Sequence, residues 1–188
     1  RGEILLELDQ LDEAISHFQR VMTNYPTDVA AFQAKYLLGV AHLEQDQLEQ
    51  AQGVWKEILE NSNLTPQAKQ WSDSLFALGK LNFHLGKIAG KKPQAAGGTI
   101  QGEKSTAQPG PYFYFEESTR RLREYVNRYP ESEKVHEARF LLARALQNLA
   151  DEPLQEMKTA RTENAREELQ RKQYRFLNMA IEQLQSLN

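Results

Sequence analysis

The chain has 188 residues, 40% of them hydrophobic and 26% charged, a composition typical of one folded domain or a short solenoid. Its 23 basic and 26 acidic residues give a net charge of −3, which argues against a strongly cationic nucleic-acid-binding protein. The sequence has no apolar run long enough to span a membrane, and no cysteine for a disulfide, a thiolate nucleophile or a cysteine-containing zinc site.

The chain begins with Arg1 and has no pattern of a signal peptide. The apolar spacing of residues 2–8 predicts the second half of a helix whose start is missing. We therefore expect the sequence to be a fragment of a larger protein.

One helical pattern recurs four times along the chain. Each copy has four residues in the order apolar, small, large apolar and apolar, separated by three, four and three positions. This spacing places all four residues on one helical face. The small residue lets a neighbouring helix approach closely. The copies are Leu11-Ala14-Phe18-Val21, Leu48-Ala51-Trp55-Ile58, Phe115-Ser118-Leu122-Tyr125 and Leu177-Ala180-Leu184-Leu187.

Partner helices are predicted over residues 34–41, 74–81 and 138–145, which resemble one another position by position. Gly39 and Gly79 lie inside these patterns, where glycine costs about 1 kcal/mol relative to alanine, so a close helix crossing is the expected reason for them. Pro26 and Pro130 are expected to end helices, with polar residues capping the helix that follows.

These phased helical pairs resemble the tetratricopeptide repeat, a family that stacks helical hairpins of about 34 residues. Leu38, Gly39, Ala51 and Trp55 carry the resemblance best. It implies an all-α fold, a right-handed α-solenoid of about four helical hairpins with a long C-terminal helix, forming a single domain over 1–188. The expected repeats are 1–28 (partial), 29–64, 65–132 and 133–188.

The junctions from Pro26 to Gly39 and from Pro130 to Ala143 are longer than is usual for the family. They are similar to repeats of bacterial cell-envelope proteins, namely outer-membrane assembly lipoproteins and cell-division coordinators of the Tol-Pal type. This similarity implies a location in the bacterial periplasm or cell envelope.

Two insertions interrupt the period, each between the two helices of a hairpin. The first, 87–111, is rich in glycine, proline and lysine, so it is predicted to be a flexible loop without helix, acting either as a spacer or as a partner-binding loop. The second, 151–173, is predicted to be helical. Since 154–188 contains neither glycine nor proline, one helix of roughly 50 Å is expected there, serving as a terminal cap or as a partner surface.

No catalytic, metal-binding or cofactor-binding motif is recognised. The histidines His17, His42, His84 and His136 lack metal-ligand spacing, and His42 is expected to pack in the core. Arg120, Arg121 and Arg123 form a basic patch that is either a solvated face or a contact for an acidic peptide. We expect a protein that is not an enzyme and binds no cofactor.

The resemblance implies that the first helices of the hairpins line a concave groove that binds a peptide or protein segment. The expected groove residues are Gln33, Tyr36, Val40, Leu43, Glu44, Asp73, Phe76, Lys80, Phe83, His84, Glu137, Phe140, Arg144, Gln147 and Asn148. For Tyr36, Phe76 and Phe140, packing between neighbouring repeats is the alternative.

The expected function is therefore a non-catalytic protein-protein interaction scaffold, whose partner is a protein or peptide rather than nucleic acid or, for this segment, a membrane. The alternative is a structural or oligomerisation segment that docks through the long C-terminal helix and the inserted edge, with self-association possible. An accessory domain of an enzyme whose chemistry lies elsewhere in the parent chain also remains open.

Overall fold

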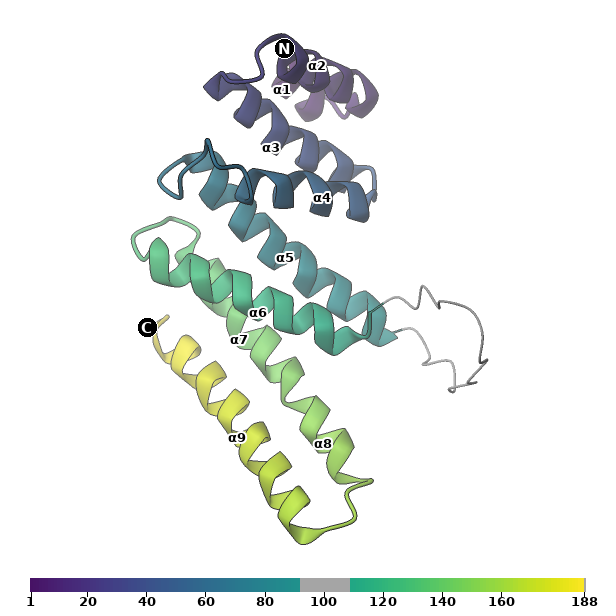
Figure 1. Cartoon of the computed structure of the whole chain (residues 1–188), viewed down its shortest axis with the longest axis vertical. Helices are drawn as coiled ribbons and strands as arrows, with labels where there is room; N and C mark the ends of the chain where they lie inside the picture. Colours follow the sequence, from purple (N-terminus) through teal and green to yellow (C-terminus); the bar gives the residue numbers. More distant parts are fainter. Residues whose placement is uncertain (92–108, 188) are drawn as a thin grey trace, which may run out of the picture. The chain divides into compact units, whose positions relative to one another are not determined.

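A computed structural model describes residues 1–91 and 109–187 and divides the chain into two compact units, Arg1–Leu81 and Asn82–Asn188. Across the described residues the regular structure is helical, with no strand, which confirms the predicted all-α class (Figure 1). The helices are α1 Gly2–Glu7, α2 Leu11–Asn24, α3 Val29–Glu44, α4 Leu48–Leu59, α5 Lys69–Lys91, α6 Pro111–Arg128, α7 Val135–Leu149, α8 Asp151–Met157 and α9 Glu163–Gln185.

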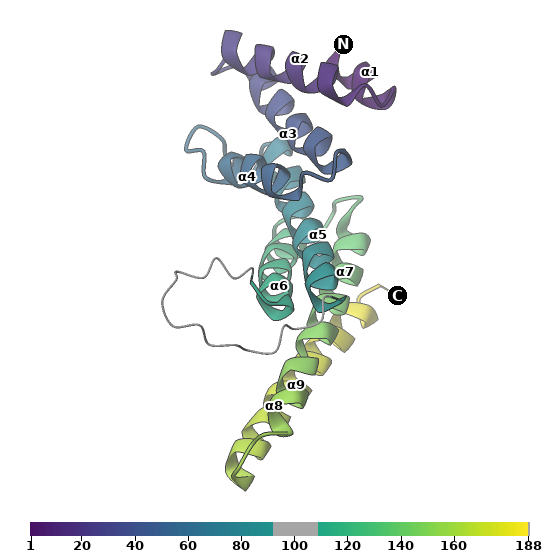
Figure 2. The same ribbon diagram turned by 90° about the vertical axis from the view of Figure 1, so that its right-hand side faces the viewer.

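The first unit consists of α1 to α4 and the start of α5. Helix α2 packs against α1 and α3, and α3 packs against α4 (Figure 2). The small residues of the recurring pattern, Ala14 and Ala51, are completely buried, as their predicted place at a helix crossing requires. The core of the first three helices is formed by Leu5, Ala14, Phe18, Ala34, Leu38 and Ala41.

Each of the two hairpins of the first unit contains a contact between a glycine of its first helix and an aromatic ring of its second. A Cβ atom added to Gly2 would lie 2.6 Å from the ring of Phe18, and one added to Gly39 would overlap the indole of Trp55. The predicted packing reason for Gly39 is therefore confirmed: the missing side chain makes room for an aromatic ring of the second helix.

The turn inside each hairpin of the first unit also has the same backbone conformation. Asp9 has φ = 58° and Asp46 has φ = 59°, and each lies directly between the two helices of its hairpin. Aspartate adopts this left-handed conformation more readily than most residues. The interval from Asp9 to Asp46 equals that from Gly2 to Gly39 and from Phe18 to Trp55, so the turn and the packing contact repeat together.

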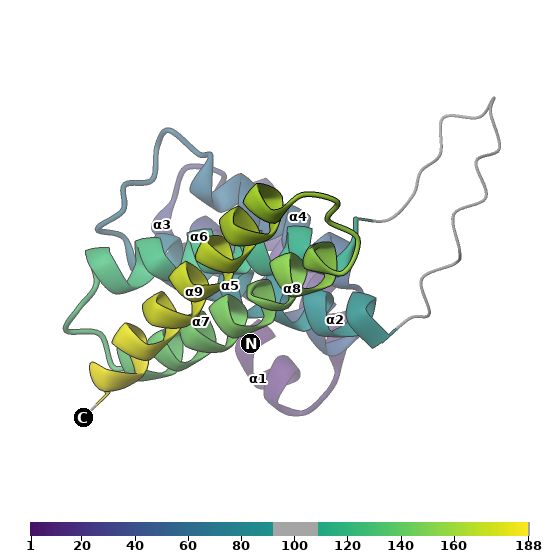
Figure 3. The ribbon, with the colours of Figure 1, turned by 90° about the horizontal axis from the view of Figure 1, so that it is seen from below.

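The second unit contains the last turns of α5 and the helices α6 to α9. Helix α6 packs against α7, and α9 packs against both α7 and α8. Seen from below, α9 runs alongside α7 and α8 (Figure 3). The core of the second unit includes side chains of α6 and α7 that are completely or almost completely buried: Leu122, Tyr125, Leu142, Leu146 and Leu149.

The predicted loop over 87–111 is wrong for residues 87–91, because α5 continues to Lys91. The lack of a side chain at Gly86 explains how these turns pack: an added Cβ would lie 2.7 Å from the ring of Phe115, and Phe83 also contacts that ring, with 5.9 Å between centroids. Helix α6 starts at Pro111, a favoured first helical position. Residues 109–110 are non-helical as expected, Pro111 is already helical, and 92–108 lie outside the described residues.

The uninterrupted helix expected from Leu154 onward is also wrong. Helix α8 ends at Met157, and α9 begins at Glu163 after Thr162, whose hydroxyl accepts a hydrogen bond from the Ala165 amide (3.3 Å). This side-chain cap satisfies a free amide at the helix start, so the chain can turn here without a glycine or proline. Helix α8 continues the direction of α7, and α9 returns beside both helices (Figure 1).

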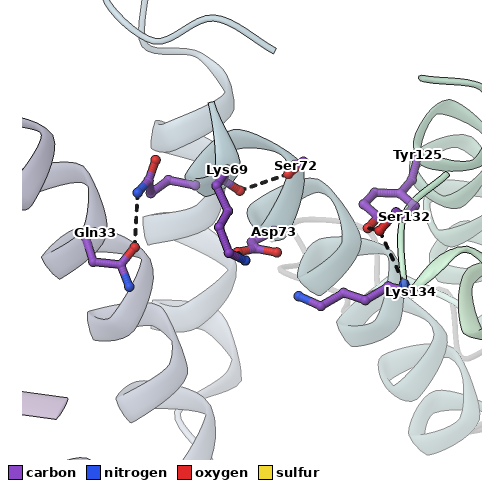
Figure 4. Close-up of polar contacts among 8 residues, drawn as sticks. Gln33, Lys69, Ser72, Asp73, Tyr125, Ser132 and Lys134 are labelled. Atoms are coloured by element: carbon purple, nitrogen blue, oxygen red, sulfur yellow. Dashed lines mark hydrogen bonds and ion pairs between the residues drawn. The ribbon is translucent and has the colours of Figure 1, made fainter. Parts of the chain in front are cut away.

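The predicted cap after Pro26 is confirmed. The Asp28 carboxylate accepts a hydrogen bond from the Ala30 amide (2.8 Å) at the start of α3. After Pro130, the residue that precedes α7, Lys134, makes no capping side-chain hydrogen bond, and Ser132 instead stabilises the turn before the helix. At the start of α7, the Ser132 hydroxyl accepts one from the Lys134 amide (3.2 Å) and shares another with the Tyr125 hydroxyl (2.6 Å; Figure 4).

Candidate protein-binding surface

Four of the predicted groove residues form a strip along α3, which we call the α3 strip: Gln33, Tyr36, Val40 and Leu43. All four side chains are half-buried, so each retains some surface for contact. The Gln33 side-chain oxygen accepts a hydrogen bond from the Gln70 amide nitrogen (3.1 Å), which joins α3 to the start of α5 (Figure 4).

Tyr36 is held in place by Trp55. The two ring centroids are 6.3 Å apart, and the Trp55 indole nitrogen donates a hydrogen bond to the backbone oxygen of Tyr36 (3.1 Å). Tyr36 therefore packs within its own hairpin while keeping part of its surface exposed. An aromatic ring fixed in this way loses little conformational entropy on binding a partner.

The predicted groove residues on the first part of α5 differ in exposure. Phe76 is only 7% exposed, so its side chain packs in the interior and does not offer an open surface. Asp73 is also buried and forms an ion pair with Lys69 (2.6 Å; Figure 4), whereas Lys80 is exposed. The burial of Phe76 favours its alternative, packing between neighbouring repeats, over a place in an open groove.

In the second unit, three predicted groove residues form an exposed strip along α7, which we call the α7 strip: Phe140, Arg144 and Gln147. Their spacing of four and then three places them on one helical face. Phe140 is 49% exposed, so about half of its side-chain surface is open to solvent. Phe83 is half-buried against Phe115, and His84 is exposed.

Sequence reasoning assigned these residues to one continuous groove. The α3 strip and Lys80 belong to the first unit, and Phe83, His84 and the α7 strip belong to the second. The continuity of the groove from one unit to the other stays a prediction.

A cavity of about 460 Å³ lies between α1, α2 and α3, and Gln33 lines it together with Leu37, His17 and Arg20. Sequence reasoning linked only Gln33 to a binding surface. The His17 imidazole nitrogen lies 3.0 Å from the Arg20 guanidinium. Loss of solvent, and then the positive charges of Arg20 and Arg1, lower the pKa of His17 from its ordinary value.

The histidine and carboxylate side chains do not gather into a metal site in the part of the chain that the structure describes. Within residues 1–91 and 109–187, no group of three or more histidine, aspartate or glutamate side chains could hold a metal ion. His42 is half-buried rather than fully enclosed, and its imidazole nitrogen lies 2.7 Å from the Gln47 side-chain oxygen. None of the described helices is long and apolar enough to cross a membrane.

The comparison with known families bears on the first hairpin, which contains the Gly2–Phe18 contact and the turn at Asp9. Residues 1–28 match the family model of the tetratricopeptide repeat. The second hairpin repeats both features of this matched segment, at Gly39, Trp55 and Asp46. No curated protein matches the chain.

Proposed function

We propose that the chain is a non-catalytic protein-interaction scaffold that binds a peptide or protein segment on the first helices of its hairpins. Tetratricopeptide repeats generally mediate protein-protein interaction, and residues 1–28 match that family. The proposal includes the right-handed solenoid of helical hairpins that the family resemblance implies.

The half-exposed ring of Phe140 carries the proposal. Burying such a ring in a pocket of a partner would remove a large apolar surface from water, and aromatic anchors of this kind dominate many interfaces. Arg144 and Gln147 follow on the same face and are exposed. A guanidinium and an amide beside an aromatic ring provide polar contacts that fix the position of a bound segment.

The α3 strip supports the same function in the first unit. It combines a fixed aromatic ring at Tyr36 with the aliphatic side chains of Val40 and Leu43. Such a surface fits a segment with apolar side chains at regular spacing, either extended or helical.

Site-specific photocrosslinking tests the proposal. A photoreactive phenylalanine analogue replaces Phe140 in one variant and Tyr174, an exposed residue of α9, in another. We expect Phe140 to crosslink to a defined segment of another protein in native lysate. A synthetic peptide of that segment should then bind the purified chain, and Phe140→Ala should weaken its binding by about 5- to 100-fold.

Tyr174 serves as the control because it is an aromatic residue of similar exposure, 55%, on a different helix. If Phe140 gives no crosslink, or if the peptide binds Phe140→Ala as tightly as the original chain, the proposal is wrong. Helical circular dichroism of each variant shows whether the fold is retained.

A structural or oligomerisation role is the second candidate. The observation in its favour is the exposure of Tyr174, Ile181 and Leu184 on α9, at 55%, 50% and 44%. Their spacing of seven and three places them on one face, as a helix packing against a second copy would require. Crosslinks from Tyr174 to the chain itself, together with a mass in solution that rises with concentration, would favour this role.

The proposed setting is the bacterial cell envelope, supported by the similarity of the long repeat junctions to those of envelope proteins. Localising the tagged protein in cell fractions tests this. A cytosolic fraction containing all of the protein would contradict it.

A further inference from the structure

A groove of about 980 Å³ runs between α6 and α9 in the second unit. It lies between the second helices of two hairpins, whereas the proposed binding strips lie on first helices. We call it the α6–α9 groove. Its lining residues are Glu116, Thr119, Arg120, Arg123, Glu124, Asn127, Arg128, Leu149, Lys172, Arg175, Phe176 and Met179.

The charge of the groove is opposite to that of the chain. Four arginines and one lysine line it, against two glutamates, whereas the whole chain has a net charge of −3. A basic groove in an acidic chain attracts anionic groups to one place on the surface.

Three of the five cations in the groove are already paired. Arg120 binds Glu117 (2.6 Å), Arg128 binds Glu124 (2.8 Å), and Lys172 binds Glu152 (2.8 Å). The other two, Arg123 and Arg175, form no ion pair or side-chain hydrogen bond with any described residue and are exposed. These two guanidinium groups can therefore bind a carboxylate without breaking an existing contact.

Apolar side chains line the groove between its charged residues. Leu149 is buried, and Phe176 and Met179, which lie three positions apart on α9, are half-buried. Thr119 is 7% exposed, and its hydroxyl has no hydrogen-bond partner within the described residues. A ligand of purely ionic character would leave the apolar part of this lining unmatched.

We propose that the α6–α9 groove binds an acidic protein segment that carries apolar anchor residues. Carboxylates of the segment pair with Arg123 and Arg175, and its apolar side chains pack on Phe176 and Met179. Glu116 and Glu124 repel a uniformly charged polyanion, which favours a peptide over nucleic acid or an anionic membrane. The stretch from Glu116 to Arg128 on α6 spans about 18 Å, the length of a helical segment of roughly 12 residues.

The probe for this site is a fluorescein-labelled synthetic peptide of roughly 14 residues, with leucine at helical spacing and glutamate at most other positions. Fluorescence anisotropy measures its binding to the full chain. We expect the double variant Arg123→Gln/Arg175→Gln to raise the Kd at least about tenfold, because two carboxylate contacts are lost.

The matched control is Arg161→Gln/Arg166→Gln, which removes the same charge at two exposed arginines outside the groove. It should change the Kd by less than about twofold, since screening weakens distant charges at physiological salt. Equal losses in both double variants would mean attraction by net charge alone and would overturn the proposal.

The three methionines provide a second readout that depends on the apolar contact. With methyl-labelled methionine, the peptide should shift the Met179 signal and leave those of Met22 and Met157 unchanged, since only Met179 lines the groove.

A peptide with glutamine in place of glutamate should bind at least about tenfold more weakly. The proposal is overturned if the peptide does not bind, if Met179 does not shift, or if a single-stranded oligonucleotide or phosphatidylserine vesicles bind as tightly through the same arginines.

Discussion

The indole ring of Trp55 occupies the space into which a side chain on Gly39 would project. The ring is almost completely buried, and its nitrogen donates a hydrogen bond to Tyr36. The glycine and the tryptophan therefore determine how closely α3 and α4 approach.

Gly39→Ala should destabilise the protein by about 1–3 kcal/mol, because the added methyl group overlaps a buried ring that has little room to move. This net destabilisation already includes the gain of about 1 kcal/mol that alanine brings to a helix. Urea unfolding followed by circular dichroism measures the change.

Gly53→Ala is the matched control, since Gly53 lies within α4 and a Cβ added there would meet nothing within 4 Å. It should stabilise the protein by about 0.5–1 kcal/mol through helix propensity alone. Stabilisation by both substitutions would show that the Gly39–Trp55 contact is not tight.

Asp46 should tolerate glycine and resist a β-branched residue, because its φ of 59° is left-handed. We expect Asp46→Val to cost about 1–2 kcal/mol and Asp46→Gly to change stability by only a few tenths. Thermal unfolding of the two variants measures the difference. Similar stabilities for the two would contradict the left-handed turn.

The hydrogen bond between the Tyr125 and Ser132 hydroxyls (2.6 Å) joins the core of α6 to the loop before α7. Tyr125→Phe should cost about 1 kcal/mol, since it leaves the ring in place and removes only the hydroxyl. A double-mutant cycle with Ser132→Ala should give a coupling energy of about 0.5–1.5 kcal/mol. A coupling energy of zero would mean that the bond does not contribute in solution.

The ion pair between Lys172 and Glu152 joins α9 to α8, and its hydrogen bond raises the pKa of Lys172 above the ordinary value of 10.5. Because the folded-state pKa is the higher one, this stabilisation is fully present below pH 10.5 and is lost as the pH rises through the raised pKa. Its size should be below about 1 kcal/mol, since both side chains are partly exposed.

A double-mutant cycle of Lys172→Met and Glu152→Gln, run at neutral pH and again at about pH 11–12, isolates this pair. The cycle is needed because burial also raises the pKa values of Tyr112 and Tyr129, which weakens the fold at alkaline pH independently of Lys172. A coupling energy that persists at the alkaline pH would contradict the assignment.

Much of the hairpin packing could be predicted from local spacing. Ala14 and Ala51 occupy one repeat position, and Phe18 and Trp55 occupy another, because each position has the same packing role in its own hairpin. A repeated packing role of this kind can be recognised in a single sequence. The start of α9 was missed because it depends on the side-chain cap at Thr162, in a stretch without glycine or proline.

The binding surface was harder to predict, because exposure depends on contacts between segments distant in the sequence. Phe76 and Phe140 occupy equivalent positions in their repeats, yet one is 7% and the other 49% exposed. Likewise, the sequence places Arg120 and Arg123 in a basic patch on one helix. Only the packing of the hairpins places them in a groove with Arg175.

The contact between Gly86 and Phe115 shows how α5, which is longer than α3, keeps its last turns packed. The last turns of α5 pack on Phe115, the first position of the recurring pattern in α6, while Ser118 and Leu122 stay buried at their usual spacing. The end of the longer α5 is therefore held against α6 by packing, with Gly86 and Phe83 both in contact with the Phe115 ring.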